Sequence, residues 1–141
     1  MNNELFYAVL LIILLLIYFN RSTTHHIYGE VAITPEEKAQ GLMFRKHPLK
    51  KYEGMLFHMG YGNNSLWMKS TYIPLDIIFL SKDGKVIGYI EDTVPLSLKS
   101  LRINKPSTYV IEMNGNSVSS QKIRIGDTIV FHKQNKYKIE K

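Results

Sequence analysis

The chain has 141 residues, of which 45% are hydrophobic and 21% are charged, and it contains no cysteine. This balance is typical of a folded domain and excludes a disordered chain. The lack of cysteine excludes disulfides, a thiol nucleophile and thiolate metal sites. Beyond the apolar N-terminal segment, the remaining length corresponds to about one domain.

The formal net charge is +6, and residues 133–141 contribute four lysines and one glutamate to it. This stretch predicts a solvated basic tail. A basic tail attracts phosphate groups. No recognition helix or aromatic platform accompanies this one, so the sequence does not favour nucleic-acid binding.

The N-terminal segment over residues 5–19 is apolar and carries no charge. As a helix it would be roughly 22 Å long. With residues 1–4 and 20–21 at the two interfaces, the sequence predicts a transmembrane anchor over residues 1–21. No Lys or Arg precedes the segment and no small-x-small cleavage site follows it, which argues against a cleaved signal peptide. Arg21 after the segment favours a cytoplasmic domain.

A polar stalk is predicted over residues 22–26, followed by a β domain over residues 27–132 and the basic tail. His25 and His26 in the stalk are adjacent, and neighbouring side chains of an extended segment point in opposite directions. The sequence therefore predicts an exposed histidine pair and no metal site there.

The β domain is expected to contain several short strands and one helix. Residues 27–33 alternate as in a half-buried strand. Thr34, Pro35 and Glu37 then predict a short helix that carries Leu42 and Met43 inward. This helix is expected to end before Pro48. Further strands are predicted at residues 55–59, 65–69, 75–80, 85–90, 108–113 and 128–132, with a helical turn at 117–122. The expected fold is mainly β, a compact small barrel or sandwich with mostly antiparallel pairing, preceded by the transmembrane helix.

Residues 67–79 form the most distinctive stretch, because they combine the single tryptophan, Trp67, with Lys69 and with Asp76 inside an apolar run. A buried carboxylate without partners costs several kcal/mol or has a raised pKa. Two interpretations follow. Asp76 either fixes the turn at residues 70–74, or it lines a pocket with Lys69 and with Trp67 as the apolar wall.

Six strings in order carry a family resemblance: KAQGLMFR at residues 38–45, GMLF at 54–57, WMKST at 67–71, LDIIF at 75–79, VIE at 110–112 and GD at 126–127. Over residues 30–131 the chain resembles the prokaryotic family called domain of unknown function 192. The resemblance implies a single, mostly β domain that is exported or anchored by an apolar N-terminal segment. It implies no established reaction. Lys38 and Ser70 depart from the Arg and Asn that are usual in the family, which bears on whether ligand specificity is shared.

The ligand-binding candidates are the polar residues of these strings together with the tryptophan: Trp67, Lys69, Thr71, Asp76, Arg45 and Glu112, with Asp127 as a further residue to test. No catalytic residue is assigned, because neither a Ser-His-Asp order nor a Gly-x-Ser-x-Gly string is present. We expect a membrane-anchored, non-catalytic β domain, without a cofactor, that binds a small ligand, a glycan or a partner protein.

Two alternatives remain open at this point. One is a hydrolase of envelope or glycan material that uses Asp76 and Glu112 as a carboxylate pair. The other is a Cu(I)-binding protein that uses His58 and the methionines, although methionine also fills irregular β cores.

Overall fold

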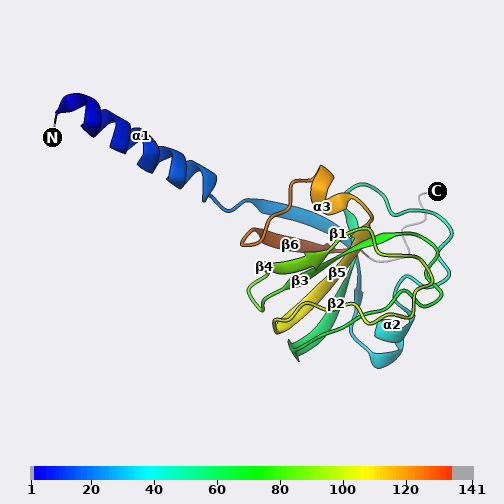
Figure 1. The fold of residues 1–141 in the computed structure, drawn as a ribbon. Coiled ribbons are helices and arrows are strands. Elements are labelled where there is room, and N and C mark those ends of the chain that lie inside the picture. The colour runs from blue at the N-terminus through cyan, green and yellow to red at the C-terminus, as the bar shows by residue number, and fades with distance from the viewer. Residues whose placement is uncertain (1, 135–141) are drawn as a thin grey trace.

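A single curved sheet of six strands forms the body of the protein (Figure 1). The computed structural model describes residues 2–134. The elements are α1 (Asn3–Phe19), β1 (Thr24–Ala32), α2 (Pro35–Gln40), β2 (Glu53–Gly62), β3 (Leu75–Leu80), β4 (Val86–Ile90), β5 (Ser107–Asn114), α3 (Ser117–Ser120) and β6 (Thr128–Lys133). The strand order is β4-β3-β5-β2-β1-β6.

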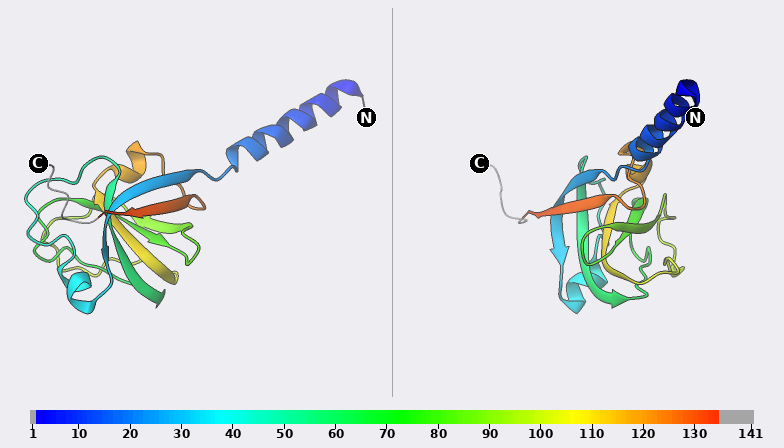
Figure 2. Two further views of the ribbon diagram at one scale, coloured as in Figure 1. Left: turned by 180° about the vertical axis from the view of Figure 1, so that it is seen from behind. Right: turned by 90° about the vertical axis from the view of Figure 1, so that its left-hand side faces the viewer.

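The sheet curls into a half-barrel, as the two views of Figure 2 show. Its edges meet at one end, where Lys85 and Thr128 form an isolated antiparallel bridge. Beside this bridge the Val86 amide donates to the Asp127 carbonyl at 2.8 Å, and the Gly126 amide donates to the Val86 carbonyl at 2.8 Å. β1 pairs in parallel with β2 and β6, and the other pairings are antiparallel. The predicted β-barrel-like class is therefore confirmed.

Each face of the sheet carries its own hydrophobic cluster. One contains Leu75, Ile77 and Phe79 of β3 and extends to Leu42 after α2 and Met68 in the loop before β3. The other contains Ile78 and Leu80 of β3, with Val118 of α3 and Ile123. Because both faces of β3 are covered, all six of its residues are buried.

Several local predictions are confirmed. β3 occupies the predicted residues 75–80. At the start of α2 the Thr34 hydroxyl accepts from the Glu37 amide at 3.2 Å, and the Glu37 carboxylate accepts from the Thr34 amide at 3.0 Å. The Glu37 carboxylate also accepts from the Ile33 amide at 2.8 Å. The two backbone hydrogen bonds that the carboxylate accepts, from Ile33 and from Thr34, hold the pKa of Glu37 below its ordinary value.

Other local predictions are wrong. Residues 65–69 form no strand and contribute one bridge between Leu66 and Leu101. The short helix does not reach Pro48, because Gly41 takes a positive φ of 47° and ends α2 after Gln40. β1 begins at Thr24, so the two histidines expected in a stalk belong to a strand. The predicted basic tail lies, from residue 135 onward, outside the described residues.

The predicted transmembrane helix is a further correction. α1 has 17 residues and ends at Phe19, since Asn20 leaves helical geometry with φ −93° and ψ 6°. A helix of this length measures about 26 Å, less than the hydrocarbon core of about 30 Å. The predicted span of residues 1–21 also includes residues 20 and 21, which lie beyond the end of α1. In residues 2–134 no helix is both long and apolar enough to cross a membrane.

Candidate ligand-binding site

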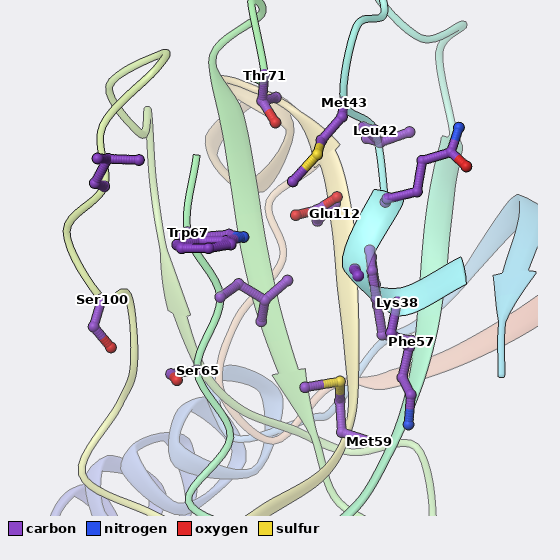
Figure 3. A pocket seen from close by; sticks show the side chains of 15 residues that line it. Lys38, Leu42, Met43, Phe57, Met59, Ser65, Trp67, Thr71, Ser100 and Glu112 are labelled. Atoms are coloured by element: carbon purple, nitrogen blue, oxygen red, sulfur yellow. The ribbon is translucent and has the colours of Figure 1, made fainter. Parts of the chain in front are cut away.

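A pocket of about 220 Å³ lies on the sheet face that α2 covers. α2 and the turn after it form one side, residues 65–67 and Thr71 form the other, and Leu98 and Ser100 lie at its edge. Figure 3 shows Glu112 between Trp67 and α2, with Thr71 and Met59 at the two ends of the pocket. The pocket is therefore assembled from segments that are distant in sequence.

Glu112 of β5 is the polar group at the floor of this pocket. The strand register places it between Met55 of β2 and Ile77 of β3, so both lateral neighbours are apolar. The residue is 4% exposed, and its Oε2 has no hydrogen-bond partner among the described residues. Burial in these surroundings raises the pKa of Glu112 to about 8. At neutral pH the group is therefore predominantly an uncharged carboxylic acid.

The walls around Glu112 are largely apolar. Phe57 and Leu42 are buried, whereas the Trp67 side chain is 46% exposed. Lys69 does not line the pocket and instead places its Nζ 5.1 Å from the centre of the Trp67 ring. This cation–π contact holds the lysine against the tryptophan.

Thr71 is buried, and its hydroxyl donates to the Lys69 carbonyl at 3.2 Å. The surrounding loop is held by further backbone bonds: the Phe44 amide donates to Ser70 at 2.8 Å and the Leu96 amide to Thr71 at 3.1 Å. These bonds fix the Trp67 side of the pocket to the turn after α2 and to the loop before β5.

Gly41 sets the distance between α2 and the floor of the pocket. A Cβ at this position would lie 3.1 Å from Phe57 Cζ and 3.6 Å from Glu112 Oε2. The positive φ of 47° also suits glycine better than other residues. On the same segment Lys38 lines the pocket, and its Nζ donates to the His58 carbonyl at 3.3 Å.

Asp76 lies outside the pocket. It is fully buried, and its carboxylate accepts from the backbone amides of Asp92 (2.8 Å), Asn116 (3.2 Å) and Val118 (2.8 Å). Asp76 thus joins the loop after β4 to the start of α3. Its partners are neither Lys69 nor Arg45, nor the amides near Thr71.

Two other candidates also have partners away from the pocket. Arg45 lies 3.9 Å from the Glu30 carboxylate and 4.0 Å from that of Glu53. Asp127 accepts from the Thr23 amide, from the Arg124 amide and from His25 Nε2, each at 2.9 Å. Burial alone would raise the pKa of Asp127, but the bonds from Thr23, His25 and Arg124 outweigh it and lower the pKa below its ordinary value. Of the six ligand-binding candidates, Trp67, Thr71 and Glu112 line the pocket, while Lys69, Asp76 and Arg45 do not.

The structure does not bring together the two carboxyl groups of the hydrolase hypothesis. Asp76 is the register partner of Met113, and Glu112 that of Ile77, so the two carboxyl groups lie on opposite faces of the β3–β5 pair. His58 is exposed and stacks on Tyr109 with ring centres 5.0 Å apart.

Four of the five methionines considered for copper lie on one face of the sheet. Met43 and Met59 line the pocket, Met55 and Met68 are core residues of that face, and Met113 belongs to the other face. Within residues 2–134 there is no group of three or more His, Asp or Glu side chains that could hold a metal ion.

Several pocket residues were not among the candidates that the sequence indicated. They include Leu42, Phe57, Ser65, Ser100 and, as a lining residue, Lys38. The strings KAQGLMFR and GMLF contained three of them. Nothing local marks Ser65 or Ser100, because their place at the pocket depends on the loop that covers this face.

The fold and the site define a small half-barrel β domain with a partly apolar pocket over a buried carboxylic acid. The family DUF192, described as "Uncharacterized ACR", matches residues 17–131, and the chain belongs to this family.

Two solved structures are similar to the chain. One, from Sinorhizobium meliloti 1021 and provisionally described as a transcription regulator, is 35% identical over 71% of this chain and 78% of its own, with a TM-score of 0.68. The other, a protein of unknown function from Novosphingobium aromaticivorans DSM 12444, is 38% identical over 71% of both chains, with a TM-score of 0.67. No curated protein matches the chain.

Proposed function

We propose that the protein is a non-catalytic binding domain that takes a small ligand into the Glu112 pocket. The observation that carries this proposal is the Oε2 atom of Glu112, which is buried at a pocket floor without a partner among the described residues. A buried polar atom left unsatisfied costs about 1–3 kcal/mol. A ligand that supplies the missing hydrogen bond recovers part of that cost, which favours binding of a ligand in this pocket.

The shape and lining of the pocket support a small molecule. An apolar cavity of roughly 150 Å³ holds a benzene ring, and this pocket is larger, at about 220 Å³. Trp67 and Phe57 offer apolar walls, while Ser65 and Ser100 offer hydroxyl groups. A few polar groups within a mainly apolar lining are typical of ligand pockets.

The titratable groups favour binding over hydrolysis. Among the described residues that line the pocket, Glu112 and Lys38 are the titratable ones. Lys38 already donates to a backbone carbonyl. Glycoside hydrolysis uses two carboxyl groups about 5–10 Å apart, and the pocket contains one.

A blocking variant tests the proposal. Ser100→Phe places a ring at the exposed edge of the pocket, and Ser119→Phe makes the same change at an exposed position on α3, away from it. Four probes that share a phenyl ring (toluene, benzamide, benzoate and benzamidine) are titrated while the fluorescence of the single tryptophan, Trp67, is recorded. We expect saturable binding of at least one probe to the wild type and to Ser119→Phe, and its loss in Ser100→Phe. Absence of binding by all four, or equal binding by Ser100→Phe, would contradict the proposal.

A further inference from the structure

The hydrogen-bonding needs of Glu112 restrict the chemistry of its ligand. We propose that the ligand presents a carboxamide or lactam edge, an uncharged acceptor beside a donor, to the Glu112 carboxyl group and places an apolar body between Trp67 and Phe57. This inference rests on the proposed function, since it names the ligand class of the same pocket.

Among the described residues that line the pocket, the one cation, Lys38, is already hydrogen-bonded and does not neutralise an ionised Glu112. The strand neighbours Met55 and Ile77 are apolar. The cation of α2 is Lys38, whose Nζ donates to the His58 carbonyl, and the cation of residues 65–71 is Lys69, whose Nζ lies over the Trp67 ring. Burial is the cause of the raised pKa of Glu112, with no contribution from either lysine. The carboxyl group is thus held in its protonated form by its apolar surroundings.

A protonated carboxyl group has a donor O–H and an acceptor oxygen on one edge. A carboxamide has the complementary pair, a carbonyl acceptor and an N–H donor, at the same spacing. Two hydrogen bonds can then form at once, and Oε2 gains the partner that it lacks in the described structure. An alcohol or ether offers one such bond at a time, and a hydrocarbon offers none.

Charged ligands fit this site less well. An ammonium or amidinium group would require Glu112 to ionise among apolar neighbours, and the desolvation of a buried ion pair offsets much of its attraction. A carboxylate ligand would bring a negative charge to a floor without a free cation among the described residues that line it. The uncharged ligand avoids both costs.

The size of the pocket is consistent with this class of ligand. Its volume of about 220 Å³ exceeds that needed for a six-membered ring and leaves room for one carboxamide. Phe57 is buried and Trp67 is half-exposed, so the apolar body can be enclosed on one side and remain open on the other. Figure 3 shows Glu112 in the space between these walls.

The four phenyl probes distinguish the ligand classes at about pH 7. We expect benzamide to bind at least about tenfold more tightly than toluene, benzoate or benzamidine, equivalent to about 1.4 kcal/mol. In Glu112→Leu the advantage of benzamide over toluene should disappear while toluene still binds, which shows that the pocket is intact. In Glu112→Gln, whose side chain keeps a donor and an acceptor, benzamide should remain the preferred probe.

Three outcomes would overturn the inferred ligand class. Tighter binding of benzamidine than of benzamide, lost in Glu112→Gln, would overturn this inference and leave the proposed function standing, because the pocket would then act through a carboxylate. Equal binding of benzamide and toluene to the wild type would overturn it in the same way. Failure of all four probes to bind would overturn both.

Discussion

Asp76 and Glu112 are buried carboxyl groups on neighbouring strands, and their side chains lie on opposite faces of the sheet. Asp76 accepts three backbone hydrogen bonds, whereas Glu112 Oε2 accepts none among the described residues. The contrast separates their roles. Asp76 stabilises the fold, whereas Glu112 carries the cost of a buried oxygen that has no partner among the described residues.

Replacing Glu112 is expected to stabilise the free protein at alkaline pH. Its pKa is raised from 4.5 to about 8, so between these values the folded state binds a proton that the unfolded state has lost. Stability from this group is therefore full below about pH 4.5 and falls as the pH rises towards about 8, by a few kcal/mol. In Glu112→Gln this fall should be absent, as urea unfolding across the pH range will show.

The matched control for that experiment is Glu91→Gln, at an exposed position. Its unfolding free energy should follow that of the wild type at every pH. If Glu112→Gln also follows the wild type between about pH 5 and 9, Glu112 is not the buried acid described here.

Removing the Asp76 carboxylate is expected to destabilise the fold strongly. Asn at this position keeps one acceptor oxygen and turns an amide group towards backbone N–H donors. Each unsatisfied buried donor costs about 1–3 kcal/mol, so Asp76→Asn should lose roughly 2–4 kcal/mol in chemical denaturation. Asp83→Asn, at an exposed turn position, is the control and should change little. A loss below about 0.5 kcal/mol for Asp76→Asn would contradict the role given to its three hydrogen bonds.

Asp127 should confer acid sensitivity in the opposite sense to Glu112. Its pKa lies below the ordinary 3.8, so its contribution is present above that value and is lost as the pH falls through its folded pKa. Asp127→Asn should therefore be less stable than the wild type at about pH 7, and the difference should shrink below about pH 4. The wild-type and variant unfolding curves, measured across this range, provide the check. A difference that stays constant down to about pH 2 would show that the charge of Asp127 is not involved.

Gly41 is expected to control both stability and access to the pocket. Alanine there must adopt φ 47° with ψ −130°, a sparsely populated conformation, at a cost of roughly 1–3 kcal/mol, and its methyl group would approach Phe57 Cζ and Glu112 Oε2 at 3.1 and 3.6 Å. Gly41→Ala should lower the melting temperature and weaken benzamide binding. Gly62→Ala is the matched control, because a Cβ there meets nothing within 4 Å. Equal benzamide affinity in Gly41→Ala and Gly62→Ala would contradict the placement of Gly41 beside the pocket floor.

Local sequence signals predicted some elements well. The apolar run of β3 and the Thr34–Glu37 capping box each depend on neighbouring residues, and both are confirmed. The position of Asp76 inside an apolar run also indicated that Asp76 is buried, and the structure confirms this. The partners of Asp76 could not be predicted, because two of them lie 40 or more positions away.

The role of Glu112 depends on strand order, which local patterns do not contain. Only the placement of β5 between β2 and β3 gives Glu112 the apolar neighbours Met55 and Ile77. The sequence predicts a strand over residues 65–69, yet this segment forms one bridge, between Leu66 and Leu101, and Trp67 forms a wall of the pocket. The predicted transmembrane helix failed on length, since Asn20 ends α1.

The central claim is tested most directly by the titration of Glu112 itself. Carbon-13 NMR of the side-chain carboxyl, assigned with Glu112→Gln, reports its protonation in the free protein. We predict a midpoint at about pH 8, moving higher when benzamide saturates the pocket, because the bound amide favours the protonated form. A midpoint near the ordinary 4.5, unchanged by benzamide, would contradict both the buried acid and the ligand class inferred from it.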